Sequence, residues 1–240
     1  MDPKIKELIN LTDDILNKET SYSDHKMIIS DYFDSHPITL NLEDKEKLFI
    51  IKRRLILIDW IYSTNIGLNR FGLEDLAKAI FQFKTDEELK KQSVDLIENL
   101  NDKNPVITKL FNLEYGQKNR KTKSLISKYL YFLNEYKFPI YDSLVKKQIK
   151  YSGEDILKFV ERVQAIMKNL ELDDYDKFDQ LLWVKGKIES EEYEGLLTKE
   201  ELKIYKTDKI DPKEIIEFKN AIAKSDLNSI IIEIKTELQI

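Results

Sequence analysis

The sequence predicts an all-α protein with a multi-helix globular body and a small C-terminal helical appendage. Apolar residues recur at helical spacing through most of the chain, and capping residues stand where helices would begin. Period-two alternation, which is typical of strands, occurs only in SIIIEIKTELQI at the C-terminus, where the pattern does not separate strand from helix. With 240 residues, 42% of them hydrophobic and 35% charged, the chain has the composition of a folded globular protein.

Capping residues mark several helix starts. Asp-Pro at Asp2 and again at Asp211 places an acid before a proline at the first helical position, where the missing N–H is not needed. Thr85 and Thr198 each begin a capping box, in which a threonine and a later glutamate bond each other's free amides. A weaker variant of the same pattern begins at Ser152.

The spacing of apolar residues places helices between these signals. It predicts amphipathic helices at 48–61, 73–83, 89–100 and 123–134. In the last of these, Lys121, Ser124, Lys128 and Tyr131 fall opposite the apolar side, so we expect a helix that buries one face and exposes lysines on the other.

A proline separates that helix from the next one. Pro139 ends any helix and holds Phe138 extended, so KFPIY is expected to be a connector. SLVKKQI then begins a second amphipathic stretch, with Asp142 just before it.

Several kinds of chemistry are excluded by composition. The chain has no cysteine, which rules out disulfides, thiolate zinc sites and cysteine nucleophiles. Its two histidines, His25 and His36, lie in a segment that we expect to be a loop and its approach, and they are expected to be solvated or capping side chains. No glycine-rich phosphate loop is present. We therefore expect no metal and no cofactor. No apolar run approaches the roughly 18 residues that span a bilayer, so a membrane partner is not expected.

One basic segment interrupts a chain that is acidic as a whole. Residues 117–150 hold nine Lys or Arg against two acids, a local charge of +7. Since the whole chain carries −5 at pH 7, the remaining residues carry −12. A basic face on an acidic protein suits a nucleic-acid partner, but a lysine-rich helix face that meets only solvent would give the same count.

Asp142 has two interpretations. An acid just before a helix commonly caps it, and Ser143 beside it could share that role. A carboxylate at a helix start, with lysines one helix length upstream, could also stabilise positive charge developing on a sugar. The residue types alone leave both interpretations open.

The order of these features resembles a known family. An amphipathic helix bearing lysine, an aromatic-Pro-aliphatic connector and Asp at the next helix start are similar to the helix-hairpin-helix DNA glycosylases. The similarity is greatest to the 8-oxoguanine DNA glycosylase branch and its short bacterial relatives. The matching residues are Ser127, Lys128, Tyr129, Leu130, Phe132, Leu133, Phe138, Pro139, Ile140, Asp142 and Ser143. A looser match spans 40–187 and includes LIDWIYSTNIG at 57–67.

The resemblance implies a mostly helical protein that binds duplex DNA, flips a damaged or modified nucleotide and cleaves its N-glycosidic bond. It assigns Asp142 the role of stabilising the oxocarbenium-like sugar and helping to activate the attacking group. Where the family has a hairpin lysine, that lysine attacks C1′ and forms a Schiff base, which adds abasic-site (AP) lyase activity. The absence of cysteine fits this branch better than the endonuclease-III-like branch, which usually carries an iron–sulfur cluster.

Two lysines are candidates for the Schiff base. Lys123 lies 19 residues before Asp142, close to the usual family interval. Lys128 instead occupies the Ser-Lys position of the short bacterial relatives. Either amine must be partly neutral near pH 7 to act as a nucleophile.

The contacts with DNA are expected to come from basic side chains. The family hairpin is glycine-rich, so that its amides can hold a phosphate, whereas EYGQKNRKTKS offers only Gly116. The remaining candidates for DNA binding are Lys118, Arg120, Lys121, Lys146 and Lys147. Tyr131 and Phe138 are candidates for stacking on a flipped base, although aromatic residues at helical spacing are more often part of the core.

The predicted body is 1–187, with a hairpin and catalytic region at 116–150, and the appendage is 188–240. The leading hypothesis is a DNA glycosylase of base excision repair, with or without AP lyase activity, in the cytoplasm and associated with the nucleoid. The alternatives are a helix-hairpin-helix-like DNA-binding protein without catalysis, and a helical module whose basic segment contacts an acidic protein surface.

Overall fold

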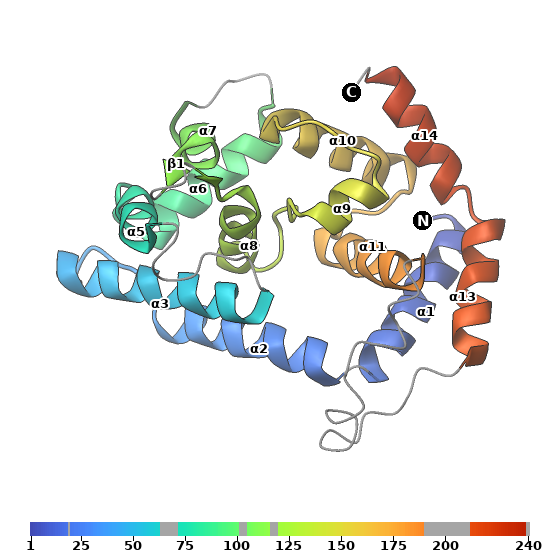
Figure 1. The fold of residues 1–240 in the computed structure, drawn as a ribbon, viewed down its shortest axis with the longest axis horizontal. Helices are drawn as coiled ribbons and strands as arrows, with labels where there is room; N and C mark the ends of the chain where they lie inside the picture. Colours follow the sequence, from blue (N-terminus) through green and yellow to red (C-terminus); the bar gives the residue numbers. More distant parts are fainter. Residues whose placement is uncertain (19, 63–71, 101–104, 116–119, 190–211, 239–240) are drawn as a thin grey trace. The chain divides into compact units, whose positions relative to one another are not determined.

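The computed structural model describes residues 1–18, 20–62, 72–100, 105–115, 120–189 and 212–238 (Figure 1). This part of the chain consists of helices joined by turns, with one pair of two-residue strands. The all-α prediction is confirmed to that extent. The chain divides into two compact units, which we name the central unit, residues 25–142, and the terminal unit, residues 1–24 with 143–240.

The central unit is built around one helix, α8. Its elements are most of α2 (Thr20–Ser35), α3 (Asp44–Tyr62), α5 (Leu73–Phe81), α6 (Asp86–Glu98), α7 (Pro105–Asn112), β1 (Glu114–Tyr115), β2 (Arg120–Lys121) and α8 (Lys123–Leu133). Helix α8 packs against α3, α6 and α7, and all of its residues except Ser124 are buried. It is therefore the core helix of this unit.

This burial corrects one expectation about α8. The helix does not expose a lysine face, because Lys123, Lys128 and Tyr131 are all buried. The apolar stripe predicts one buried face, but on the polar side of the helix Lys128 also meets Tyr62 of α3 and Asp142. Lysine tolerates such a position when its aliphatic stem packs against apolar groups and its amine finds a partner.

The terminal unit combines both ends of the chain. Its complete helices are α1 (Pro3–Lys18), α9 (Ser143–Gln148), α10 (Ile156–Asn169), α11 (Tyr175–Glu189), α13 (Pro212–Lys224) and α14 (Leu227–Glu237). Helix α1 packs against α11 and α13, α9 against α11, and α10 against α14. Arg162 of α10 is fully buried and donates to the carbonyl oxygens of Ile149 at 2.7 Å and Ile231 at 2.9 Å. It thereby ties α10 and α14 to the end of α9.

Two of the predicted helix starts are confirmed in detail. Helix α1 begins at Pro3, and Asp2 Oδ1 accepts the amide of Lys4 at 2.7 Å. Thr85 caps α6 through its side-chain oxygen, which accepts the amide of Glu88 at 3.2 Å, while the amide of Thr85 donates to the carbonyl oxygen of Phe83 at 2.7 Å instead of to Glu88. The predicted capping box at Thr198 lies outside the described residues.

The predicted cap at Ser152 is wrong. Helix α10 begins later, and its N-cap is Asp155, whose Oδ1 accepts the amide of Leu157 at 2.8 Å. The hydroxyl of Tyr151 donates to the carbonyl oxygen of Asp155 at 2.6 Å, and residues 151–155 between them are not helical. A carboxylate next to the helix therefore provides the cap in place of the more distant serine hydroxyl.

The C-terminal ambiguity resolves in favour of helix, since α14 covers most of SIIIEIKTELQI. Helix α11 continues through the predicted boundary after Lys187 to Glu189, and residues 190–211 are not described. The division into 1–187 and 188–240 stays a prediction. Among the described helices, none is both long and apolar enough to cross a membrane.

Candidate functional site

The structure brings Lys128 and Asp142 together. Lys128 lies in the middle of α8, and its Nζ donates to Asp142 Oδ2 at 3.1 Å. The side chain of Lys128 is only 5% exposed, whereas that of Asp142 is 26% exposed. The lysine is thus the buried member of this ion pair, and the carboxylate is the member that reaches solvent.

Two further groups surround the Lys128 amine. Its Nζ donates to Ser124 Oγ, one helical turn earlier in α8, at 2.9 Å. The ring of Tyr62, at the end of α3, has its centroid 5.4 Å from the same nitrogen. A hydroxyl, a carboxylate and an aromatic face therefore hold this amine in one place.

Lys123 lies elsewhere on the same helix. It is also buried, and its Nζ stands 5.6 Å from the centroid of the Tyr141 ring. The ion pair of Lys128 with Asp142 joins a candidate nucleophile to a candidate carboxylate.

A strained turn leads from α8 to Asp142. Glu135 and Tyr136 follow the helix with φ of 52° and 69°, in the left-handed region that non-glycine residues seldom adopt. The ring of Phe138 then stacks on Phe111 of α7, with centroids 6.1 Å apart and planes at 11°. These contacts bring the chain back along α8, so that residue 142 reaches the middle of the helix.

The candidate DNA-binding residues are spread over both units. Gly116 and Lys118 lie outside the described residues. Arg120 and Lys121 form β2, which pairs antiparallel with β1 through Tyr115↔Arg120 and Glu114↔Lys121. In the terminal unit, α9 carries Lys146 and Lys147. Lys146 Nζ lies 3.5 Å from Glu154 Oε1, and Lys147 is exposed.

The candidate stacking residues are both in the core. Tyr131 is 1% exposed and packs edge-on against Phe132, and Phe138 is fully buried on Phe111. Either ring would have to leave these contacts before it could stack on a base. Their role as stacking residues stays a prediction.

Sequence reasoning missed a buried polar network beside the pair. Arg54 of α3 is fully buried, and its Nη1 and Nη2 donate to Asp86 Oδ1 and Oδ2 at 2.7 and 2.8 Å. Nη1 also donates to the hydroxyl of Tyr129 at 3.1 Å, and Nη2 to the carbonyl oxygens of Phe33 and His36. Because Tyr129 is the neighbour of Lys128, this network fixes α8 at the point where the candidate nucleophile stands.

A signal for this network was present in the sequence. Arg54 falls on the apolar face of its helix, with Ile51, Leu55 and Ile58, and all four residues are buried. A guanidinium in such a position needs an acidic partner. The sequence does not say which acid, and the pattern that begins at Thr85 predicts only a capping box.

The network predicts an alkaline loss of stability. Burial raises the pKa of Tyr129 to about 12 from an ordinary value of 10.0, and Arg54 opposes the rise. Between these two values the unfolded chain loses the phenol proton and the native chain keeps it. The free energy of unfolding is therefore intact below pH 10 and should fall by about 2–3 kcal/mol as pH rises through 12.

Urea unfolding of the wild type and of Tyr129→Phe across this pH range measures the effect. The difference in unfolding free energy between the two proteins should shrink with rising pH, because the variant has no phenol to titrate. A constant difference would contradict the assignment.

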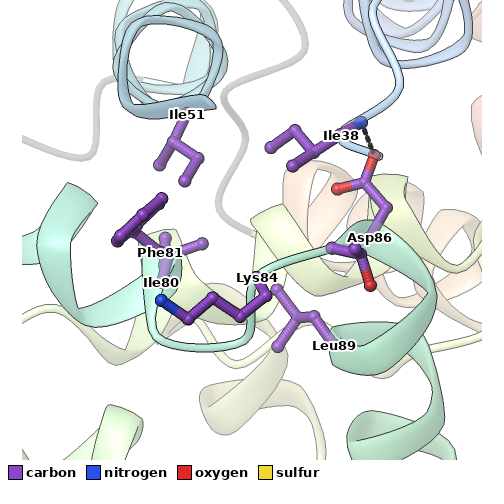
Figure 2. A pocket seen from close by; sticks show the side chains of 8 residues that line it. Ile38, Ile51, Ile80, Phe81, Lys84, Asp86 and Leu89 are labelled. Carbon is purple, nitrogen blue, oxygen red and sulfur yellow. Dashed lines mark hydrogen bonds between the residues drawn. The ribbon is translucent and has the colours of Figure 1, made fainter. Parts of the chain in front are cut away.

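A small cavity lies next to the same aspartate (Figure 2). Its volume is about 10 Å³, which is room for one water molecule. Figure 2 shows the side chains of Ile38, Ile51, Ile80 and Leu89 around it and Asp86 bonded to the amide of Ile38, a contact of 2.8 Å. The cavity cannot admit a nucleobase and is not the candidate site.

Within the described part of the chain, no three His, Asp or Glu side chains gather closely enough to hold a metal ion. Comparison of the chain with protein-family models, with curated proteins and with solved structures gives no match.

Proposed function

We propose that the chain is a DNA N-glycosylase of helix-hairpin-helix type, with AP lyase activity, in which Lys128 and Asp142 are the catalytic residues. The contact between Lys128 Nζ and Asp142 Oδ2, at 3.1 Å, carries the proposal. It joins the two residue types that the chemistry needs, and both belong to the segment that resembles the family. Lys128 is favoured over Lys123 because of this contact.

The proposed reaction has two steps. The neutral amine of Lys128 attacks C1′ of the deoxyribose, and the N–C1′ bond forms as the bond from C1′ to the base breaks. The electron pair of the broken bond leaves with the base, which takes up one of the two protons that the nitrogen then carries. The ring oxygen takes up the proton that Asp142 first accepted from the amine, and the sugar opens to leave a protonated Schiff base between Lys128 and C1′.

Asp142 supports both steps. Its carboxylate is within reach of the Lys128 amine and is partly exposed, so it can accept the proton that the amine must lose. The same negative charge stabilises positive charge that develops at C1′ and the ring oxygen. A substrate would approach from the solvent side of Asp142.

The local charge supports DNA as the partner. Residues 117–150 carry +7 in a chain of −5, so the candidate pair lies in the most basic part of the sequence. When such a segment binds DNA, it releases counterions from the phosphates, so the affinity for DNA falls steeply as the salt concentration rises.

The test uses duplex DNA that contains an abasic site, whose aldehyde needs no prior base removal. The amine adds to this aldehyde, water leaves, and borohydride reduces the resulting Schiff base to a stable secondary amine. We expect a covalent protein–DNA adduct on a denaturing gel, and a DNA affinity that falls about 10-fold or more between 50 and 200 mM salt. Intact duplex DNA of the same sequence is the control for the adduct.

A DNA-binding protein without catalysis is the second candidate. The near-complete burial of the Lys128 amine favours it, because a lysine that only holds α8 to the connector would look the same. Binding with the expected salt dependence but without any adduct would favour this candidate over the glycosylase.

A further inference from the structure

One hydroxyl connects α8 to the connector beside the candidate pair. Ser127 is fully buried, and its Oγ accepts the amide of Tyr141 at 2.9 Å. The same hydroxyl donates to the carbonyl oxygen of Ser124 at 2.9 Å, and the carbonyl oxygen of Tyr141 lies 3.5 Å away, so both of its contacts outside α8 are with Tyr141. This single side chain thus satisfies a buried amide of a segment outside any helix.

This hydrogen bond joins the two residues that directly precede Lys128 and Asp142 in the sequence. Ser127 directly precedes Lys128, and Tyr141 directly precedes Asp142. The Ser127–Tyr141 bond therefore sets the register of the connector against α8, and the next residue on each side forms the ion pair at 3.1 Å. A slip of the connector by one residue would place a different side chain opposite Lys128.

We infer that Ser127 is the positioning residue of the site: its hydroxyl holds the connector in the register that sets Asp142 against Lys128. The inference rests on the proposed function for its catalytic consequence, although the register itself is a property of the fold. Ser127 does not touch the reacting atoms, and it acts only through Asp142.

The rest of the connector gives α8 no amide at Pro139, which has no N–H, and the turn before it contains the strained residues Glu135 and Tyr136. Without the hydroxyl, the buried amide of Tyr141 would lose this hydrogen bond, so a shift of the connector toward water would become more favourable in free energy. Such a shift would carry Asp142 with it, because the two residues are adjacent.

Two isosteric variants test the inference. Ser127→Thr and Ser127→Val add the same volume at the same buried position, but only threonine keeps the hydroxyl. We expect Ser127→Thr to trap abasic DNA at close to the rate of the wild type and Ser127→Val to trap it about 10- to 100-fold more slowly. DNA affinity should stay the same in both, since Ser127 is buried and cannot reach DNA.

Ser93→Ala is the matched control, with Ser127→Ala as its partner. Ser93 is also fully buried in the central unit, and its hydroxyl donates to Lys90 O at 2.7 Å and Asn134 Oδ1 at 3.0 Å. Both alanine variants lose a buried hydroxyl, but only Ser127→Ala should slow trapping. Circular dichroism confirms that each variant is folded at the assay temperature.

A second readout does not depend on glycosylase activity. Acetic anhydride labels lysine amines, and mass spectrometry of the digested protein gives the rate at Lys128. Pairing with Asp142 protects this amine in the wild type and in Ser127→Thr, so labelling should become at least about 10-fold faster in Ser127→Val and Ser127→Ala. If the wild type traps no DNA, the proposed function fails, while labelling still tests the register.

Equal Lys128 labelling in Ser127→Val and Ser127→Thr would overturn the inference. Equal trapping by these two variants, with a trapping wild type, would overturn it as well. Slow trapping by Ser93→Ala to the same degree as by Ser127→Ala would assign the effect to general loosening of the core and would also overturn it.

Discussion

Lys128→Met is expected to abolish the borohydride-trapped adduct, whereas Lys123→Met is expected to keep it at the level of the wild type. Methionine preserves most of the buried stem in each case and removes only the amine. Lys128 Nζ lies 3.1 Å from Asp142, and Lys123 Nζ stands over the Tyr141 ring. Loss of a nucleophile typically lowers the rate by at least about 10³-fold, so trapping by Lys128→Met should fall below detection.

The two variants control each other. Both variants remove one positive charge from a buried position in α8, so each lowers the local charge by one. A general effect on DNA binding or folding should therefore appear in both. An adduct that survives in Lys128→Met and disappears in Lys123→Met would transfer the nucleophile to Lys123. An adduct that survives in both would remove the candidate pair from the mechanism altogether.

Local sequence signals predicted several helices of this protein, but the segment around His25, expected to be a loop and its approach, forms α2 (Thr20–Ser35). The apolar spacing at 48–61, 73–83, 89–100 and 123–134 corresponds to α3, α5, α6 and α8. The cap at Thr85 is confirmed by its hydrogen bond to the amide of Glu88. Proline at the first helical position is confirmed at Pro3 of α1 and Pro212 of α13. These signals succeed because capping and helix propensity depend on neighbours within a few residues.

The surroundings of each helix could not be predicted in the same way. Apolar spacing identifies the face that must be buried, but it does not count the helices that will cover the opposite face. The spacing therefore predicts a solvated face that includes Lys128 and Tyr131, whereas both side chains are buried in the structure. The sequence did place Asp142 at a helix start, and the structure adds its partner 14 residues earlier.

Polar contacts between residues far apart in the sequence could not be predicted either. Arg54 and Asp86 are 32 residues apart, and Tyr129 is 75 residues from Arg54. Nothing in the local pattern around Asp86 distinguishes a residue that only follows a cap from one that neutralises a buried guanidinium. Asp86 accepts hydrogen bonds from Arg54 and from the amide of Ile38, each at 2.8 Å. Both donors come from distant parts of the chain.

Removal of this acid should have the largest effect on stability. Asp86→Ala leaves the guanidinium of Arg54, which is fully buried, without its only carboxylate in the described network, and it removes the acceptor of the Ile38 amide. Breaking a buried ion pair from one side costs about 3–5 kcal/mol. Domains unfold with about 5–15 kcal/mol, so the central unit should be strongly destabilised or unfolded at room temperature.

A surface pair of the same unit gives the control for this variant. Lys90 Nζ lies 3.1 Å from Glu135 Oε1, with side chains 40% and 68% exposed, and exposed pairs contribute about 0–1 kcal/mol. Urea unfolding should therefore separate Asp86→Ala from Lys90→Ala by at least about 2 kcal/mol. The replacement of both Arg54 and Asp86 by Met and Leu should cost less than Asp86→Ala alone, because no buried charge is then left unpaired. A double variant that is less stable than Asp86→Ala would show that the bonds of Arg54 to the carbonyl oxygens of Phe33 and His36, rather than the ion pair, hold α2 and α3 together.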